Sequence, residues 1–423
     1  MQQGQLNEGD YDRERFEERV WRLARQRDIG RRRILGLIGL AGAGSVLAGC
    51  GWSGGKRRME PANSTPTTGA SGAPAPWVKS VSEDKFIIHK TNAEMRWEQM
   101  RGQGYTTPND LFFIRNHTQT VRIDRGGWRL RVQGSGVARS LDLGYDELVK
   151  LGQTTVTRFV ECAGNGRVFF GEAQGHKAQG SPWRLGAIGV AEWTGVPLGA
   201  VLERAGVKPT ARDIMPVGLD ELMVRRPLPL AKAMAEDTLL VYGMNGEDLP
   251  PDHGAPVRTL VPGWVGAANV KWVGRVEVSE EPLLSEWNTT SYVLLGPGYR
   301  PQGPAKGPVL TTLGVKSALE LPWPAALTRG HQTVSGRSWS ATGRIRQVEY
   351  RVDDGPWRLA RLAGINEPTA WMQWSFDWDA TPGFHILRTR ATDDQGNTQP
   401  DSWPFNQQGY LYGAVVAHPV TVA

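Results

Sequence analysis

Residues 154–167 have the sequence T-T-V-T-R-F-V-E-C-A-G-N-G-R. The β-branched run Thr154–Val160 predicts a buried strand. Ala163 and the two glycines that follow it allow the backbone to turn tightly and to approach a ligand. Cys162 is therefore expected at the end of a strand, where sites often form. Because a lone cysteine usually packs as a small hydrophobic side chain, the residue types alone leave a purely structural role for Cys162 open.

The bulk composition is that of a globular protein. The chain has 423 residues, of which 39% are hydrophobic and 22% are charged, enough for two or three domains with sizeable cores. Its 2 cysteines exclude a disulfide framework, and because no C-x-x-C-H segment occurs, no covalently attached c-type haem is encoded.

The net charge does not indicate a nucleic-acid partner. It is +6 at pH 7, but residues 1–49 carry nine Arg against seven acidic residues, which leaves +4 over the remaining 374 residues. Such weak, dispersed positive charge does not make the footprint expected of a nucleic-acid-binding surface.

The N-terminal region has the form of a twin-arginine export signal. Three arginines at 31–33 precede an apolar, glycine-rich run to Ala48, which at about 15 residues is too short for an ordinary membrane span. Leu47–Cys50 resembles a lipobox, although small residues also occur by chance at cleavage sites. Residues 51–76 are rich in Gly, Ser, Pro and Thr and predict a flexible tether.

These features predict an exported protein, with a signal at 1–50 and a tether at 51–76. The protein is expected in the periplasm or on the outer face of the cytoplasmic membrane. It would contact the membrane only through a lipid anchor on Cys50.

The segment that follows the tether mixes strands and helices. Residues 128–134 alternate like a strand, and short helices are expected at 142–151 and 197–205, the latter opened by a proline. No regular βαβ rhythm and no G-x-G-x-x-G after a strand occur, so a Rossmann domain is not expected. This segment, residues 77–300, is predicted to be the catalytic domain.

A β-sandwich is predicted for residues 301–423. A passage rich in Gly and Pro at 296–308 marks the boundary. Beyond it, alternating runs such as Ile345–Val352 and Phe384–Thr392 are separated by turn residues, as in an immunoglobulin-like sandwich. The expected fold class is α+β.

The segment F-V-E-C-A-G-N-G-R resembles the signature of the sulfite oxidase family of molybdenum enzymes, and the resemblance extends from about Thr107 to the C-terminus. It implies a mixed α/β molybdopterin domain followed by a sandwich that serves dimerisation. It also implies a molybdenum–molybdopterin cofactor with Cys162 as the protein ligand to the metal. A thiolate is a soft ligand suited to such a metal.

The resemblance also suggests roles for residues outside this segment. Arg115, Arg167, Trp183 and Tyr292 match the substrate site, where Tyr292 would hydrogen-bond the substrate or an oxo ligand. His117, Asp220, His253, Arg258 and Lys271 match positions that hold the cofactor, and the last two are natural anchors for a phosphate. For each residue taken singly, a structural role remains open: a solvated loop around Arg115, a packing aromatic at Tyr292, or a buried polar network at the cofactor positions.

One position departs from the family pattern. Where family sulfite oxidases carry an arginine in a W-N-x-R-G run, this chain has F-N-Q-Q-G at 405–409, with Gln408 in place of the arginine. Loss of one fixed cation should weaken the binding of a doubly charged anion by about 1.5–3 kcal/mol.

The predicted function is oxidation of sulfite to sulfate, with electrons passed to an external acceptor such as cytochrome c. A homodimer is expected. One alternative is a sulfane or thiosulfate-type dehydrogenase, or a sulfoxide or nitrate reductase, on the same fold. Another is a cell-surface binding lipoprotein without catalytic activity, because a fold does not determine a function.

Overall fold

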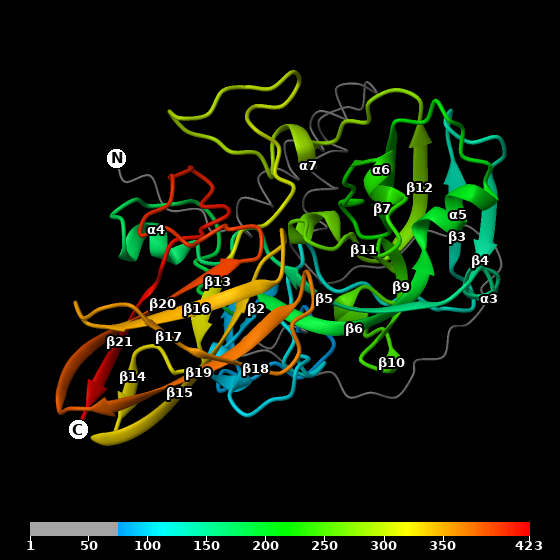
Figure 1. Ribbon diagram of the computed structural model, residues 1–423. Coiled ribbons are helices and arrows are strands. Elements are labelled where there is room, and N and C mark those ends of the chain that lie inside the picture. Colours follow the sequence, from blue (N-terminus) through cyan, green and yellow to red (C-terminus); the bar gives the residue numbers. More distant parts are fainter. Residues whose placement is uncertain (1–74) are drawn as a thin grey trace, which may run out of the picture.

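The structure is a computed structural model, and it describes residues 75–423. The predicted export signal with Cys50, and the tether up to residue 74, lie outside the described residues. Figure 1 shows two regions side by side, one with strands β3 to β12 and the other with strands β13 to β21. Within residues 75–423, no helix has the length and apolar character needed to cross a membrane.

The first region is built on two five-stranded sheets. One sheet has the order β10-β9-β6-β5, with β11 also paired to β9, and the other has the order β4-β3-β12-β7-β8. The strands of the first sheet are β5 (Thr154–Glu161), β6 (Ile188–Pro197), β9 (Leu239–Met244), β10 (Glu247–Asp248) and β11 (Arg258–Leu260). Those of the second are β3 (Arg129–Gln133), β4 (Leu141–Gly144), β7 (Asp213–Gly218), β8 (Leu228–Pro229) and β12 (Val273–Ser279).

The helices of this region are short, and the longest has 7 residues. They are α3 (Tyr145–Val149), α4 (Val168–Glu172), α5 (Leu198–Arg204), α6 (Leu230–Ala233) and α7 (Glu286–Thr289), with 3-10 turns η1 (Trp97–Met100), η2 (Pro251–His253) and η3 (Gly266–Ala268). A hairpin of β1 (Phe86–His89) and β2 (Asn92–Met95) precedes them. Sheets with peripheral helices confirm the expected α+β fold.

The sequence analysis predicted four of these elements, and three of the four were placed correctly. The predicted strands at 154–160 and 128–134 correspond to β5 and β3, and the predicted helix at 197–205 corresponds to α5. The prediction of one helix over 142–151 was wrong at its start. Residues up to Gly144 form β4, which pairs with β3, and α3 begins only where the Glu147 carboxylate accepts from the Gly144 N–H (2.7 Å).

The second region is the predicted sandwich. One sheet has the order β13-β15-β19-β18 and the other β14-β21-β20-β16-β17. The strands are β13 (Lys316–Leu319), β14 (Ala325–Leu327), β15 (Gly330–Trp339), β16 (Ile345–Val352), β17 (Arg358–Leu359), β18 (Arg361–Ala363), β19 (Trp371–Ala380), β20 (Gly383–Asp393) and β21 (Ala417–Val422). The alternating runs found in the sequence coincide with β16 and β20, which confirms an immunoglobulin-like sandwich. The boundary placed at residue 300 stays a prediction.

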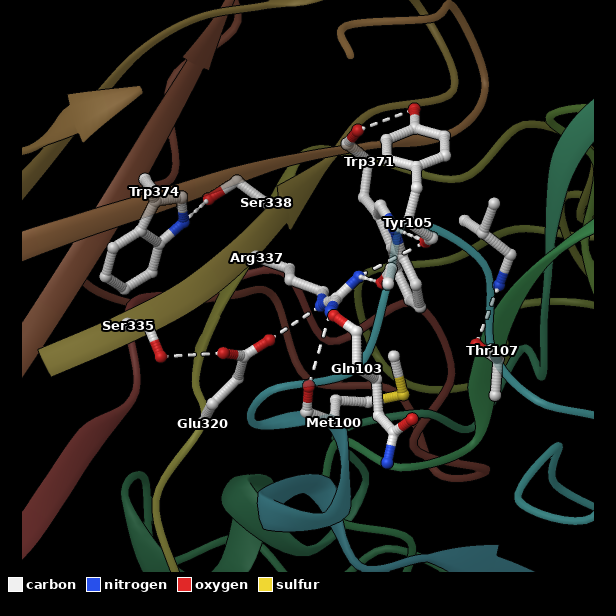
Figure 2. A network of polar contacts seen from close by, with 12 residues as sticks. Met100, Gln103, Tyr105, Thr107, Glu320, Ser335, Arg337, Ser338, Trp371 and Trp374 are labelled. Atoms are coloured by element: carbon white, nitrogen blue, oxygen red, sulfur yellow. Dashed lines mark hydrogen bonds and ion pairs between the residues drawn. The ribbon is translucent and has the colours of Figure 1, made fainter. Parts of the chain in front are cut away.

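A buried cation joins the two regions. Arg337 on β15 is fully buried and pairs with Glu320 (2.6 Å). Its guanidinium also donates to the carbonyls of Met100 (3.3 Å) and Gln103 (3.1 Å), which belong to the first region. Figure 2 shows this network, with Arg337 between Glu320 and the loop that carries Gln103. The sandwich is therefore packed against the first region through directional polar contacts as well as through its core.

Candidate functional site

Cys162 lies directly after β5, where the chain leaves the sheet. Its N–H donates to the Ala187 carbonyl (2.9 Å), and its carbonyl accepts from the Asn165 N–H (3.0 Å), so a tight turn follows it. The side chain is buried and is not part of a disulfide. A Cβ at Gly266 would come within 2.8 Å of the Glu161 carbonyl oxygen. Glycine at 266 therefore permits η3 to approach the cysteine turn closely.

A pocket that is partly open to solvent lies beside Cys162, and we call it the first pocket. Its walls come from segments that are distant in the sequence: the stretch after residue 111, the end of β5, the turn after β7, and the segments around η2, η3 and residue 292. Most of the predicted residues line it, namely Arg115, His117, Cys162, Asp220, His253, Arg258, Lys271 and Tyr292. The fold therefore brings these residues to one place.

Two buried cations lie together in the first pocket. The Arg258 guanidinium donates to the His253 carbonyl (3.0 Å), and the Lys271 ammonium donates to the Asp252 carbonyl (2.6 Å) and to Asn116 Oδ1 (2.5 Å). Burial lowers the pKa of Arg258 to about 9. Burial, helped by Arg258, also holds the pKa of Lys271 well below its ordinary value. Buried basic side chains held by neutral oxygens favour an anionic ligand such as a phosphate, because an anion stabilises their charged forms.

His253 is buried at the same place. Burial, followed by the charges of Lys79 and Lys271, lowers its pKa well below the usual value, so the ring is neutral near pH 7. The ring packs edge-on against Phe112, with centroids 5.2 Å apart. Among the described residues, its Nε2 has no hydrogen-bond partner. Because a buried polar atom normally has one, a polar ligand in the first pocket is the expected partner.

Asp220 also has a buried side-chain atom that lacks a hydrogen-bond partner among the described residues. It lies in the turn after β7, and its Oδ1 accepts from the Val224 N–H (3.0 Å). Its Oδ2 is buried without a partner within residues 75–423. Burial raises the pKa of the carboxyl group. An N–H donor from a ligand would satisfy this oxygen and would favour the charged carboxylate.

The segment after the tether is hydrogen-bonded to Asp252, the residue that precedes His253 of the first pocket. The Asp252 carboxylate accepts from the backbone N–H groups of Val78 (2.8 Å) and Lys79 (2.7 Å) and from the Thr120 hydroxyl (2.6 Å). Burial lowers the pKa of Lys79 to about 7. The sequence analysis did not identify Lys79 or Asp252, because neither contact has a local signal.

A smaller, second pocket adjoins the first. Arg115, His117 and Tyr292 line both pockets. Its other walls include Arg167 and Gln408. A small anion in the second pocket would therefore lie next to whatever occupies the first.

Arg167 is fixed tightly in this wall. Its Nε donates to the Gln408 carbonyl (2.8 Å) and its Nη1 to the Ser181 carbonyl (2.9 Å), while its guanidinium carbon lies 5.3 Å from the centre of the Tyr410 ring. Glycines surround it closely. An added Cβ would come within 2.5 Å of Arg167 at Gly164, within 2.6 Å at Gly180 and within 2.5 Å at Gly409.

Tyr292 has an unusual backbone conformation. Its φ is 52°, a region that non-glycine residues rarely adopt and that is found at functional sites. Its hydroxyl lies 3.2 Å from His117 Nε2. Its ring stacks on Tyr410, with centroids 5.3 Å apart. The hydroxyl and imidazole thus form a polar pair in the wall that separates the two pockets.

Residues from the C-terminal part of the chain, which also forms the sandwich, line the second pocket. Gln408 and Tyr410 line it, although both follow the strands of the sandwich up to β20. The sequence analysis identified Gln408 but missed Tyr410. The only available signal for Tyr410 was its position two residues after Gln408.

Trp183 differs from the other predicted residues in its place. It is fully buried and belongs to the hydrophobic cluster that contains Cys162, Phe113 and Val160. Its ring contacts His89 edge-on, with centroids 5.1 Å apart. It is not among the residues that line the first or the second pocket. Its assignment to the substrate site stays a prediction.

Comparisons with known proteins agree with this arrangement. Residues 117–287 match the family model described as the oxidoreductase molybdopterin binding domain. Sulfite oxidase of Gallus gallus is 36% identical over 329 residues, which cover 72% of this chain and 70% of that protein. The chain belongs to the sulfite oxidase family. Mitochondrial sulfite oxidase of Mus musculus is also 36% identical, over 74% of this chain, but the match spans only 61% of the mouse protein.

A solved structure supports the same assignment. The sulfane dehydrogenase SoxCD from Paracoccus pantotrophus is similar with a TM-score of 0.70 and 28% sequence identity, over 82% of this chain and 90% of that chain. The likeness therefore includes the sandwich as well as the molybdopterin binding domain.

The residues of the first pocket fit the cofactor that a sulfite oxidase family domain implies. Arg258 and Lys271 suit a phosphate, and the unpaired atoms of His253 and Asp220 suit polar groups of a pterin. The Cys162 side chain, a soft ligand when deprotonated, lines the same pocket. The chain thus carries an oxidoreductase-type molybdopterin domain whose pocket suits its cofactor.

Proposed function

We propose that this protein is a molybdenum-cofactor oxidoreductase that oxidises sulfite to sulfate and passes the electrons to an external acceptor such as cytochrome c. The observation that carries the proposal is the shared wall of the two pockets. Arg115, His117 and Tyr292 line both, so an oxyanion in the second pocket would contact the reactive side of a group held by Cys162 in the first.

The side chains of the first pocket would bind the cofactor, and those of the second pocket would bind the substrate. Cys162 would hold the metal, and Arg258 and Lys271 would hold the cofactor phosphate. When bound, the cofactor supplies oxygen-atom transfer and two-electron redox chemistry. Arg115 and Arg167 would neutralise the oxyanion, since fixed cations in a water-poor site stabilise charge without reorganising. The Tyr292 hydroxyl, paired with His117, would orient one oxygen of the substrate.

The test measures metal and turnover separately. Purified protein should contain about one molybdenum per chain, and it should reduce cytochrome c only when sulfite is added. Replacing Cys162 by Ser should abolish this reduction. Full activity of the serine variant would refute the role of the thiolate, and the absence of molybdenum from a correctly exported preparation would favour a non-catalytic binding lipoprotein.

A sulfane dehydrogenase is the second candidate. The similarity to SoxCD and the neutral Gln408 in the second pocket favour it, because a neutral side chain suits a substrate of lower charge. A screen with a dye acceptor separates the two activities. Turnover of a sulfane-sulfur compound without turnover of sulfite would support the second candidate.

We also propose that the protein is exported by the twin-arginine route and is anchored by a lipid on Cys50. The support is the sequence of residues 31–50. Replacing Arg31, Arg32 and Arg33 by lysine should retain the protein in the cytoplasm. Mass spectrometry of the mature N-terminus should detect an acylated Cys50, and a cleaved but unmodified cysteine would refute the anchor. The proposed homodimer would appear in light scattering at twice the mass of one chain.

A further inference from the structure

Glu161 precedes Cys162 in the chain, and both oxygens of its carboxylate are hydrogen-bonded. Its Oε1 accepts from the Asn165 side-chain amide (2.9 Å) and from the Lys316 ammonium (2.6 Å), and its Oε2 accepts from the Trp339 indole N–H (2.9 Å). Glu161 is fully buried. Two of these three donors come from the sandwich, since Lys316 opens β13 and Trp339 closes β15.

The same cluster holds the other side of the cysteine turn. The Lys316 ammonium also donates to the Asn165 carbonyl (3.0 Å). The Asn165 side-chain oxygen accepts from the Ala187 N–H (3.1 Å), and the Ala187 carbonyl accepts from the Cys162 N–H. Residues 161 and 165 flank the cysteine, so one lysine of the sandwich contacts the turn on both sides of Cys162.

A role in stability alone does not account for this cluster. A buried ion pair is often replaceable by apolar residues of similar volume at no loss of stability. Lys316 is 3% exposed and Trp339 is 0% exposed. Directional bonds to fixed atoms restrict the orientation of the turn, which packing by apolar groups does not do to the same extent.

We propose that Lys316 and Trp339 of the sandwich are positioning residues for the Cys162 thiolate. They act through Glu161 and Asn165 and set the direction in which the sulfur points into the first pocket. The sandwich is then part of the metal site as well as a platform for association. This inference rests on the proposed function, because it takes Cys162 as the metal ligand.

The main test uses the holoenzyme with Lys316→Met, which keeps the length of the side chain and removes its donors. The EPR spectrum of the one-electron-reduced enzyme should change, because it depends on the orientation of the metal–sulfur bond. The rate of molybdenum loss during dialysis, followed by elemental analysis, should rise roughly 10- to 100-fold, because loss of a residue that orients a metal ligand typically lowers metal affinity by that factor and the dissociation rate reflects it. Trp339→Phe removes one donor to Glu161 and should shift both readouts in the same direction by less.

Arg337→Met is the matched control. It breaks a buried ion pair with Glu320 inside the sandwich, together with hydrogen bonds from the sandwich to the loop at 100–105 of the first region, but Arg337 does not bond the cysteine turn (Figure 2). It should destabilise the protein and leave the EPR spectrum unchanged.

An unchanged spectrum and metal-loss rate in both Lys316→Met and Trp339→Phe would overturn the inference. An equal spectral change in Arg337→Met would also overturn it. If wild-type protein contains no molybdenum, the proposed function itself fails. The two failures are therefore distinguishable.

Discussion

Replacing Gly409 by alanine should displace the Arg167 side chain. Gly409 has a φ of 60°, and a Cβ on it would lie 2.5 Å from Arg167 Cγ and 2.6 Å from Ala178 Cβ. Because Ala178 contributes its own Cβ to the clash, the methyl group cannot be accommodated by Arg167 alone. The guanidinium would leave its bonds to the Gln408 and Ser181 carbonyls.

The substitution has two expected costs, one in the stability of the fold and one in the binding of the substrate anion. An L-residue in the left-handed region costs about 1–2 kcal/mol of stability, and overpacking adds about 1–3 kcal/mol. Loss of one hydrogen bond from a charged group to the substrate anion costs about 1.5–3 kcal/mol. In terms of kcat/KM for sulfite, that is a loss of roughly 10- to 150-fold.

Gly175→Ala is the control for backbone strain. Gly175 has a φ of 71°, and nothing lies within 4 Å of an added Cβ. Thermal denaturation should show both variants destabilised, and steady-state turnover of sulfite should fall only in Gly409→Ala. Equal turnover in the two variants would refute the steric argument for Arg167.

Three further outcomes are expected. Gln408→Arg should lower the KM for sulfite roughly tenfold or more by adding a cation to the second pocket, whereas Gln408→Met should not, and a rise in KM for the arginine variant would contradict this. Lys271→Met should reduce the molybdenum content of purified protein, because the phosphate loses an anchor; full content would contradict that role. Burial lowers the pKa of His418 to about 4. The unfolded chain, with a pKa of about 6.5, therefore binds a proton that the folded protein does not as pH falls, and stability at pH 5 should be about 2 kcal/mol lower than above pH 6.5 from this group. Urea unfolding should show this loss in the wild type and not in His418→Gln.

The sequence correctly predicted the strands whose residue pattern depends only on neighbours in the chain. The run of β-branched residues in β5 and the alternation in β16 and β20 depend on neighbours in the chain, so these strands were placed correctly. The helix expected from residue 142 failed because Leu141 and Leu143 belong to a strand pair with β3. The start of this segment is a strand because it pairs with β3, which lies some ten residues earlier in the chain. The helical periodicity of residues 142–151 gives no information about that pairing.

The candidate site was found by resemblance rather than by physical pattern. Nothing local relates Arg115 to Cys162 or Tyr292, and only the fold unites them in the two pockets. The Lys316–Glu161 pair has no sequence signal at all, since its partners are 155 positions apart. Asn116, which accepts from Lys271, was passed over for its charged neighbours.

Two hydrogen bonds between residues far apart in the sequence bear on the order of folding. Arg167 bonds Gln408, 241 positions further along the chain, and Val78 bonds Asp252, 174 positions further along. Contacts of such sequence separation form late, because long loops must close first. During synthesis, neither the contact between Val78 and Asp252 nor the wall of the second pocket that carries Gln408 can form until residues 252 and 408 have left the ribosome. A chain truncated before residue 405 should therefore retain β5 and its cysteine but present an open cavity. Loading of a cofactor is then expected after translation has passed this point rather than alongside it.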